Sequence, residues 1–274
     1  MSARVSSITA FRLTTARLES LTRFYEGLGF AAGDPAIIGE DEMALLGLER
    51  GGTRMPLRLG GQRLDLDSFD VPGRPYPPGG TAADLCFQHF AIVTDDAEIA
   101  WQRVRSLGAV PISSSGPVRL PPETGVAAAV KFRDPEGHPL ELVQFAYASG
   151  RSWTGTHLYG IDHSAISVSD VSASQRFYES LGLTVRGRTL NQGPTQMVLD
   201  GLADAVVDVV PMLPHRDTPH LELLGYRTPA GRVTDRLEAN DIAGTRLVWE
   251  ADRDELIRDP DGHLHLLRHG QPVA

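Results

Sequence analysis

The feature of this sequence that most limits its fold is an internal repeat. Residues 21–30 are LTRFYEGLGF and residues 174–183 are SQRFYESLGL, with 153 residues (177 − 24) between their phenylalanines. A second motif also occurs twice: residues 132–142 are FRDPEGHPLEL and residues 257–267 are IRDPDGHLHLL. Such self-similarity indicates that one structural unit has been copied along the chain.

The segments around these motifs predict the elements of the unit. Each FY motif follows an alternating apolar segment, Ser7–Thr15 or Ile161–Val168, of the kind that forms a half-buried strand. At the first motif, the segment Leu18–Leu28 has apolar residues at helical spacing, and Gly29 is suited to the helix C-terminus. The same pattern recurs at the second motif, where the glycine is Gly182. The Asp-Pro-x-Gly sequence of the second motif predicts a turn between two strands.

The repeats divide the chain into four units. Their approximate bounds are 6–72, 84–146, 159–228 and 229–269. The first three units each have a strand, a helix and further strands. In the fourth, a strand at Thr245–Glu250 is followed almost at once by the second Asp-Pro turn, so we expect its helix to be missing.

The fold class that follows is α+β, with four βαβββ-type units, the fourth truncated. We expect these units to pair into cupped mixed β-sheets with flanking helices. At the level of domains, residues 1–146 form an N-terminal half with units one and two. Residues 147–274 form a C-terminal half with unit three and the truncated unit four.

Composition excludes several classes of protein. The balance of 26 basic to 35 acidic residues, a net charge of −9, argues against a nucleic-acid partner. The single cysteine, Cys86, cannot form an internal disulfide and favours a reducing compartment. No stretch approaches the roughly 20 apolar residues of a membrane span, and the N-terminal residues lack the apolar core of a signal peptide. We expect a cytoplasmic monomer or homodimer with no nucleic-acid or membrane partner and a small-molecule substrate.

The repeated unit, with its FYxxLGF and RDPxGHxLEL motifs, resembles the vicinal oxygen chelate superfamily over residues 6–269. That superfamily includes glyoxalase I, extradiol ring-cleaving dioxygenases, fosfomycin-resistance proteins and bleomycin-binding proteins. The resemblance implies that paired units curl into a cup that holds a metal ion. Each unit can offer a histidine from its first strand and a glutamate from its last, because inward-facing strand residues converge on the axis of the cup.

The resemblance implies four metal ligands in this chain: His89 and Glu141 in unit two, and His163 and Glu222 in unit three. The separations within the two pairs are similar, 52 and 59 residues, which supports equivalent positions. Two imidazoles and two carboxylates suit a divalent ion such as Zn, Ni, Co, Fe(II) or Mn. A ligand carboxylate would also act as the catalytic base, and the sequence does not choose between Glu141 and Glu222.

Units one and four are poor in ligands. Ala10 stands at the histidine position of unit one, and Leu266 stands at the glutamate position of unit four. The histidine position of unit four falls near Gly244. We expect Asp65 to be a surface aspartate and His220 to face away from the cup.

Two pairings of the units are open. If unit two pairs with unit three, and unit one with unit four, all four ligands fall in one site. If unit one pairs with unit two, and unit three with unit four, then His89 and Glu141 lie in one cup with Asp65, whereas His163 and Glu222 lie in the other. We favour the first pairing.

The resemblance implies a metal-dependent lyase or isomerase of glyoxalase type, acting on a small substrate that chelates the ion through neighbouring oxygens. An Fe(II) extradiol-type dioxygenase is the first alternative, although such enzymes usually carry their ligands in units three and four. The second alternative is a metal-free protein that sequesters a small molecule, as bleomycin-resistance proteins do. One scaffold serves many reactions, so the fold does not choose among them.

Overall fold

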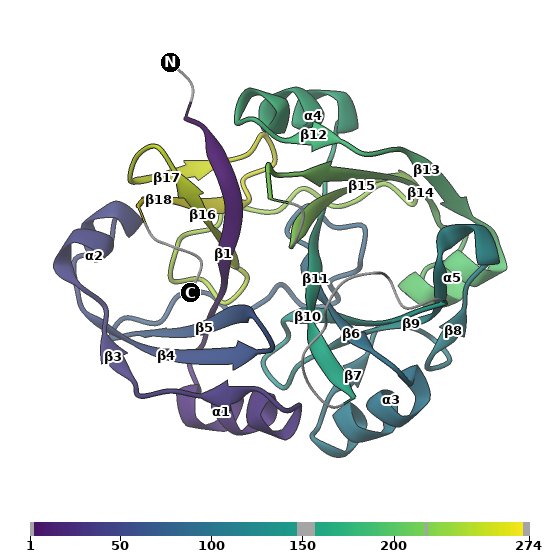
Figure 1. Cartoon of the computed structure of the whole chain (residues 1–274), viewed down its shortest axis with the longest axis horizontal. Helices are drawn as coiled ribbons and strands as arrows, with labels where there is room; N and C mark the ends of the chain where they lie inside the picture. The colour runs from purple at the N-terminus through teal and green to yellow at the C-terminus, as the bar shows by residue number, and fades with distance from the viewer. Residues whose placement is uncertain (1–2, 147–156, 217–218, 271–274) are drawn as a thin grey trace.

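The computed structural model describes residues 3–146, 157–216 and 219–270. It consists of two curled mixed sheets that stand side by side, with helices packed around them (Figure 1). The expected α+β class is therefore confirmed. The predicted division into halves at residues 146 and 147 stays a prediction, because the linker residues 147–156 lie outside the described residues.

Units one and two have the same core plan of a strand, a helix and a closing pair of long strands. Unit one comprises β1 (Val5–Thr14), α1 (Leu18–Gly27), β2 (Ala31–Ala32), β3 (Ala36–Ile37), α2 (Glu40–Leu46), β4 (Gly52–Leu59) and β5 (Gln62–Phe69). Unit two comprises β6 (Gln88–Thr94), α3 (Ala97–Ser106), β7 (Val110–Pro111), β8 (Val118–Arg119), the 3-10 turn η1 (Pro122–Thr124), β9 (Val126–Arg133) and β10 (Pro139–Phe145).

Unit three repeats this plan, and unit four keeps only its strands. Unit three comprises β11 (Leu158–Ser167), α4 (Val171–Ser180), β12 (Thr184–Val185), β13 (Thr189–Gln192), α5 (Pro194–Asp200), β14 (Val206–Leu213) and β15 (His220–Thr228). Unit four comprises β16 (Arg246–Ala251), β17 (Glu255–Arg258) and β18 (Leu264–His269). The chain passes from β16 directly to β17, so the expected loss of the fourth helix is confirmed.

The strand order decides which units share a sheet. Sheet one has the order β17-β18-β16-β1-β5-β4-β2, with β3 on β4, and so combines units one and four. Sheet two has the order β12-β14-β15-β11-β6-β10-β9-β7, with β13 on β14 and β8 on β9, and so combines units two and three. The first strands of paired units meet at the centre of each sheet, as antiparallel neighbours. The favoured pairing of units is the one observed.

The two sheet centres share a pair of irregularities. In β11 the register against β6 shifts between Leu158 and Gly160 and again between Ile161 and His163. In β1 the register against β16 shifts between Val5 and Ser7 and again between Ile8 and Ala10, which are the equivalent positions 153 residues earlier. A bulge changes the direction in which the next side chains point. Both copies of the unit therefore have the same pair of bulges in the first strand, which set the direction of the side chains that follow.

The two sequence motifs meet in space across the sheets. Tyr25 of the first FY motif donates a hydrogen bond to Asp134 of the first Asp-Pro turn (3.0 Å), and His138 Nδ1 lies 2.7 Å from the same carboxylate oxygen. Tyr178 makes the equivalent bond to Asp259 (3.0 Å), beside His263. Each motif pair therefore joins a helix of one sheet to a turn of the other, and the turn histidines have a structural role.

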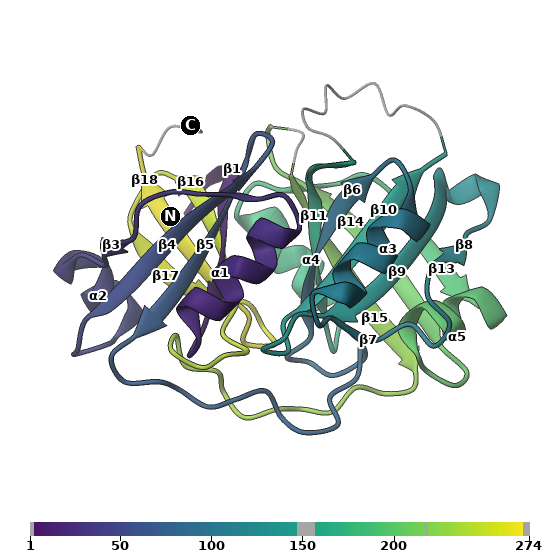
Figure 2. The same cartoon turned by 90° about the horizontal axis from the view of Figure 1, so that it is seen from below.

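One continuous core packs between and around the sheets. It contains large side chains from all four units, such as Phe11, Phe90, Tyr178 and Trp249. Helices α1 and α3 lie next to each other where the sheets meet (Figure 2), and Arg103 Nε donates to the carbonyl of Gly27 across this contact. A Cβ at position 27 would lie 2.7–2.8 Å from the methyl groups of Leu107, so glycine there lets the two helices approach without displacing that side chain.

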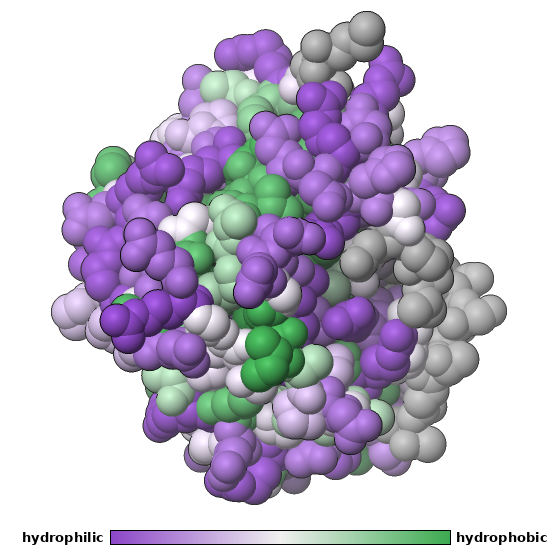
Figure 3. Space-filling view, turned by 90° about the vertical axis from the view of Figure 1, so that its left-hand side faces the viewer, coloured by the Kyte–Doolittle hydropathy of each residue, from purple (hydrophilic) through white to green (hydrophobic). Residues whose placement is uncertain are grey.

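The surface on the side of α2 and β3 is mostly hydrophilic, with apolar side chains gathered in a central band (Figure 3). Among the large apolar residues, Ile37 at the end of β3 is 78% exposed. Among the described residues, no helix has the length and apolar character needed to cross a membrane.

Candidate metal centre

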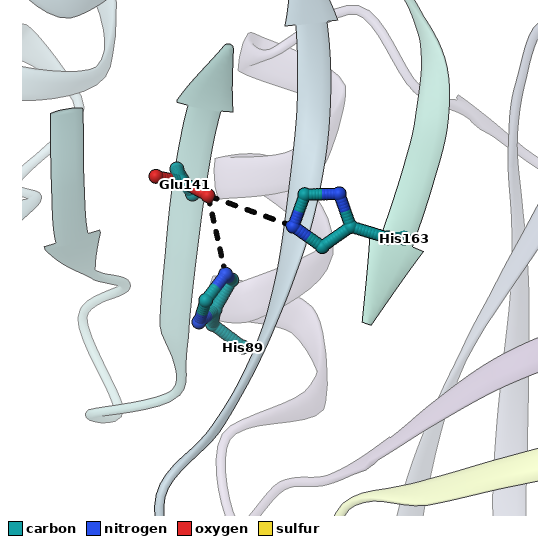
Figure 4. Close-up of side chains that lie close together, drawn as sticks. All are labelled: His89, Glu141 and His163. Carbon is teal, nitrogen blue, oxygen red and sulfur yellow. Dashed lines mark hydrogen bonds and ion pairs between the residues drawn. The ribbon is translucent and has the colours of Figure 1, made fainter. Parts of the chain in front are cut away.

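The four predicted ligand residues come from the four central strands of sheet two. Glu222, His163, His89 and Glu141 lie on β15, β11, β6 and β10, which are neighbours in that order. Glu141 Oε2 lies 3.2 Å from His89 Nε2 and 3.6 Å from His163 Nε2. His163 Nε2 is also 3.7 Å from Glu222 Oε2. The Nε2 atom of each imidazole therefore faces the carboxylate of Glu141 (Figure 4).

Two further residues belong to this cluster. His220 Nε2 lies 3.5 Å from Glu222 Oε1, and Asp162 Oδ2 lies 3.0 Å from His163 Nδ1. The expectation that His220 faces away was wrong. Residues two apart on a strand point to the same side, so the signal was present in the spacing of His220 and Glu222. Asp162 is the extra residue of the bulge between Ile161 and His163, which explains how adjacent residues 162 and 163 both reach the cluster.

Asp162 and His163 form a carboxylate–imidazole pair. His163 Nδ1 donates a hydrogen bond to Asp162, which leaves Nε2 on the side of Glu141 and Glu222. Metal-bound histidines in proteins are commonly oriented in this way by a carboxylate on the second nitrogen. Two groups in the described part of the chain have ligand atoms close enough to share a cation: His89, Glu141 and His163, and Asp162, His163 and His220.

The pKa directions show where the cluster stabilises positive charge. Burial alone would lower the pKa of His163, but the Glu222 charge and the hydrogen bond to Asp162 raise it well above its usual value. Burial would raise the pKa of Glu141, but hydrogen bonds with His163 and His89 bring it well below its usual value. The pKa of His89 is lowered, because burial outweighs the opposing effect of Glu141. A cation is therefore favoured between Glu141 and Glu222.

The charge balance of the cup also favours a cation. Glu141 and Asp200 are buried, and the Glu222 side chain is 19% exposed. Lys131 is the one lysine or arginine paired with any of these three carboxylates in the described residues. Buried carboxylates need a compensating charge. Together with the imidazoles of His89 and His163, they form a donor set that suits a divalent transition metal.

Sheet one has lost this ligand set, as the strand register shows. Ala165 faces His89 and Glu222 on its neighbouring strands, and the equivalent residue Arg12 faces Arg246 and Asp65. The residue at the position of His89 is therefore Arg246, two residues beyond the expected Gly244. Ala10 takes the position of His163, and Leu266 that of Glu141, as expected.

A network of buried ion pairs fills sheet one in place of ligands. Asp65 is fully buried and pairs with Arg12 at 3.1 Å and with Arg63 at 2.7 Å, so the expectation of a surface aspartate was wrong. Arg246 is likewise fully buried and pairs with Asp67 at 2.7 Å. The sequence contained no sign of the Arg246–Asp67 pair, since these two residues are 179 positions (246 − 67) apart in the chain.

The fold and the site together define a class of protein. Two cupped sheets built from four copies of one unit, with a histidine and carboxylate cluster across the centre of one sheet, form a vicinal-oxygen-chelate scaffold. Residues 7–142 match the family model described as Glyoxalase/Bleomycin resistance protein/Dioxygenase superfamily. The chain belongs to this superfamily.

Comparison with solved structures extends the likeness to the whole chain. A mutant glyoxalase I from Zea mays is 16% identical, with 97% of this chain and 92% of that chain covered and a TM-score of 0.59. A proposed dioxygenase from Bacillus subtilis is 14% identical, with 98% and 86% covered and a TM-score of 0.60. At these identities the likeness shows the fold alone. No curated protein sequence matches the chain.

Proposed function

We propose that this chain is a metal-dependent lyase or isomerase of glyoxalase type that acts on a small substrate with two neighbouring oxygens. In this proposal, His89, Glu141, His163 and Glu222 bind one divalent ion, which is Zn, Ni, Co, Fe(II) or Mn. The observation that carries the proposal is the position of His163 Nε2, within 3.6–3.7 Å of oxygens from both glutamates. Among the described residues, Lys131 is the one lysine or arginine paired with Glu141, Glu222 or Asp200.

The ion and the protein residues around it would have separate roles. When bound, the ion would act as a Lewis acid that polarises the substrate oxygens. Asp162 would hold the ring of His163, and His220 would hold Glu222 through its Nε2. Because such partners orient ligands and tune their basicity, we regard both residues as part of the centre.

One of the two glutamates would also move the proton. Glu141 is 8% exposed and lies against two imidazoles, whereas Glu222 is 19% exposed. A carboxylate at this place can take a proton from a carbon next to a substrate carbonyl and return it to the neighbouring carbon. Removal of the proton leaves a negative charge on the substrate, and the bound ion would stabilise that charge. A base next to the ion would therefore make the proton transfer easier. Glu141 and Glu222 are the two candidates for this role.

A second candidate function has one specific observation in its favour. The group of His89, Glu141 and His163 has two imidazoles and one carboxylate, the ligand set typical of Fe(II) oxygenases. An extradiol-type dioxygenase would use the same residues with molecular oxygen as a co-substrate. Consumption of oxygen therefore separates the two enzymes. The metal-free sequestering protein stays the third candidate.

Elemental analysis of protein purified without chelators tests the proposal. We expect about one transition metal per chain in wild type, and its loss in both His89→Ala and His163→Ala. The matched control is His215→Ala, because His215 is exposed and lies outside the cluster. If no sample binds any of the five ions after reconstitution, the metal-dependent proposal fails and the sequestering protein remains.

An assay under anaerobic conditions then separates the enzymes. A lyase or isomerase should turn over without oxygen and with several divalent ions. A dioxygenase should consume oxygen in step with substrate and lose activity when its iron is oxidised. Activity that depends on oxygen would replace the lyase or isomerase proposal with the dioxygenase.

A further inference from the structure

A second polar group lies beside the candidate metal centre, on the other side of Glu141. Asp200 is the last residue of α5, and its carboxylate accepts hydrogen bonds from Lys131 (2.6 Å), Gln196 (2.6 Å) and Tyr226 (2.8 Å). Lys131 and Asp200 are buried, with 5% and 0% of their side chains exposed. None of the four residues was predicted to belong to the metal centre.

The position of Lys131 connects this group to the centre. Lys131 on β9 is directly opposite Glu141 on β10, and opposed residues of neighbouring strands point to the same face. The Asp200 carboxylate lies 2.6 Å from Lys131 Nζ and supplies the opposite charge that a buried ammonium needs. Lys131 therefore presents a fixed positive charge to the same cup as the proposed metal ligands.

The geometry at α5 holds the pair in place. Ser113 donates a hydrogen bond to the carbonyl of Leu199 (2.7 Å), and Ser113 also accepts one from the backbone N–H of Lys131 (2.9 Å). Gly201 follows Asp200 with a positive φ of 61°, and a Cβ there would lie 2.2 Å from the carbonyl oxygen of Ile112. The end of α5 is therefore pressed against unit two, which fixes Asp200 over Lys131.

Sheet one supplies an internal control for this arrangement. The residue opposite Leu266 on β17 is Leu256, just as Lys131 is opposite Glu141. The last residue of the equivalent seven-residue helix α2 is Leu46, where α5 has Asp200. Phe69 follows Asp65 by four residues, as Tyr226 follows Glu222. Leu46, Phe69 and Leu256 pack together in one apolar cluster.

At these equivalent positions the copied unit therefore has apolar residues in sheet one and a buried ion pair in sheet two, although sheet one has buried ion pairs elsewhere. Apolar replacement of a buried ion pair is often neutral or stabilising. Stability alone does not explain why the pair is present only in the sheet that carries the ligand cluster. Asp200 is the one hydrogen-bond acceptor that the described residues offer to Lys131 Nζ. The ammonium has three N–H donors, so it can also donate to a ligand in the cup.

We propose that Lys131, positioned by Asp200, selects a substrate with a carboxylate next to a carbonyl or hydroxyl oxygen, a small 2-oxo or 2-hydroxy acid. This inference rests on the proposed function, because the two neighbouring oxygens of such an acid would chelate the metal ion. The carboxylate would accept a charge-assisted hydrogen bond from Lys131 Nζ, which is stronger than a bond between neutral groups. Tyr226 and Gln196 hold the second oxygen of Asp200, so that its charge stays directed at Lys131.

Two probes of nearly equal shape test this proposal. Oxamate and oxamide both have two neighbouring oxygens, but only oxamate carries a negative charge. Binding of each to the cobalt(II)-loaded protein is measured by calorimetry. The informative quantity is the ratio of the two affinities, since the metal alone will favour the anion to some extent in every variant.

The principal variant is the double substitution Lys131→Leu with Asp200→Leu, which copies Leu256 and Leu46 and leaves no buried charge unpaired. We expect it to bind cobalt within about threefold of wild type, and its oxamate-to-oxamide affinity ratio to fall at least tenfold. The affinity ratio of Lys131→Met is also measured. Only variants that keep the wild-type circular dichroism spectrum are used to judge the proposal. Arg119→Met, which removes an exposed positive charge from the adjoining β8, is the control and should leave the ratio unchanged.

The outcomes separate this inference from the proposed function. If cobalt binds and the ratio does not change in the Lys131 variants, Lys131 does not select the substrate. A loss of affinity for both probes by the same factor also overturns the inference, and shows that Lys131 only balances the charge of the glutamates. Wild-type protein that binds no cobalt overturns the proposed function, and the inference with it.

Discussion

Asp67 of sheet one tests whether the two sheets have different roles. Its side chain is fully buried and receives three hydrogen bonds from arginines: two from Arg54, at 2.7 and 2.9 Å, and one from Arg246, at 2.7 Å. In Asp67→Asn the shape is kept, but the negative charge that compensates these guanidinium groups is lost. We expect the variant to be less stable and its metal binding to be unchanged.

The magnitude follows from the pKa of Asp67. Burial alone would raise this pKa, but the charge and hydrogen bonds of Arg54 and the charge of Arg246 lower it from 3.8 to about 2. At about 1.36 kcal/mol for each pH unit, this difference corresponds to about 2.5 kcal/mol. Breaking a buried ion pair from one side costs about 3–5 kcal/mol. We therefore expect Asp67→Asn to lower the free energy of unfolding by about 2–4 kcal/mol at pH 7.

The pH dependence has a definite sign. A carboxyl group whose pKa is lower in the folded state stabilises the fold above its unfolded pKa, and this contribution is lost as the pH falls through the folded value. The stability difference between wild type and Asp67→Asn should therefore be complete above about pH 4. It should shrink as the pH falls from 4 to 2, because the wild-type carboxyl group then becomes protonated.

Urea and thermal unfolding measure the effect. For a chain of this size, 2–4 kcal/mol corresponds to a Tm decrease of about 4–16 °C. Asp70→Asn is the matched control, because Asp70 follows the same strand and is exposed; it should change stability by less than about 0.5 kcal/mol. An unchanged stability at pH 7 would refute the assignment of a structural role to this network. Loss of the metal from Asp67→Asn would refute the separation of roles between the sheets.

The remaining predictions concern the metal centre and the contact between the sheets. Asp162→Asn should keep the fold but lower metal affinity about 10–100-fold in a competition titration, since the ring of His163 loses its orienting carboxylate. Tyr25→Phe should lower the free energy of unfolding in urea by about 1.5–3 kcal/mol, because the buried Asp134 carboxylate loses a donor; a loss below about 0.5 kcal/mol would contradict this reading. Removal of metal with EDTA should lower the Tm of wild type but not that of His163→Ala, since only the folded state of wild type binds the ion.

Much of the local structure could be predicted from the sequence, because strands and helices depend on short-range periodicity. The predicted strand Ser7–Thr15 corresponds to β1 (Val5–Thr14), and the predicted helix at Leu18–Leu28 corresponds to α1 (Leu18–Gly27). The short helices α2 and α5 were missed. Each has only seven residues, too few for a periodic pattern to stand out from its surroundings.

The candidate site could be predicted in part. The repeat singled out His89, Glu141, His163 and Glu222, and the folded chain brings all four together. His220 could have been found from the same strand alternation that was applied to Glu222. Lys131 and Asp200 could not, because a lysine next to a turn and an aspartate at a helix end carry no pattern until the fold puts them 2.6 Å apart.

By itself, the sequence determined that one unit recurs four times, that the last copy lacks its helix, and that histidine and glutamate occupy matched strands of the middle copies. Repetition and alternation are local properties, and they are visible in the order of residues. Only the tertiary structure decided that units two and three share a sheet, that Arg246 and Asp65 replace ligands in the other sheet, and that a buried lysine faces the cluster. These features depend on which distant strands pair in a sheet. Strand pairing in turn depends on how the whole hydrophobic core is buried.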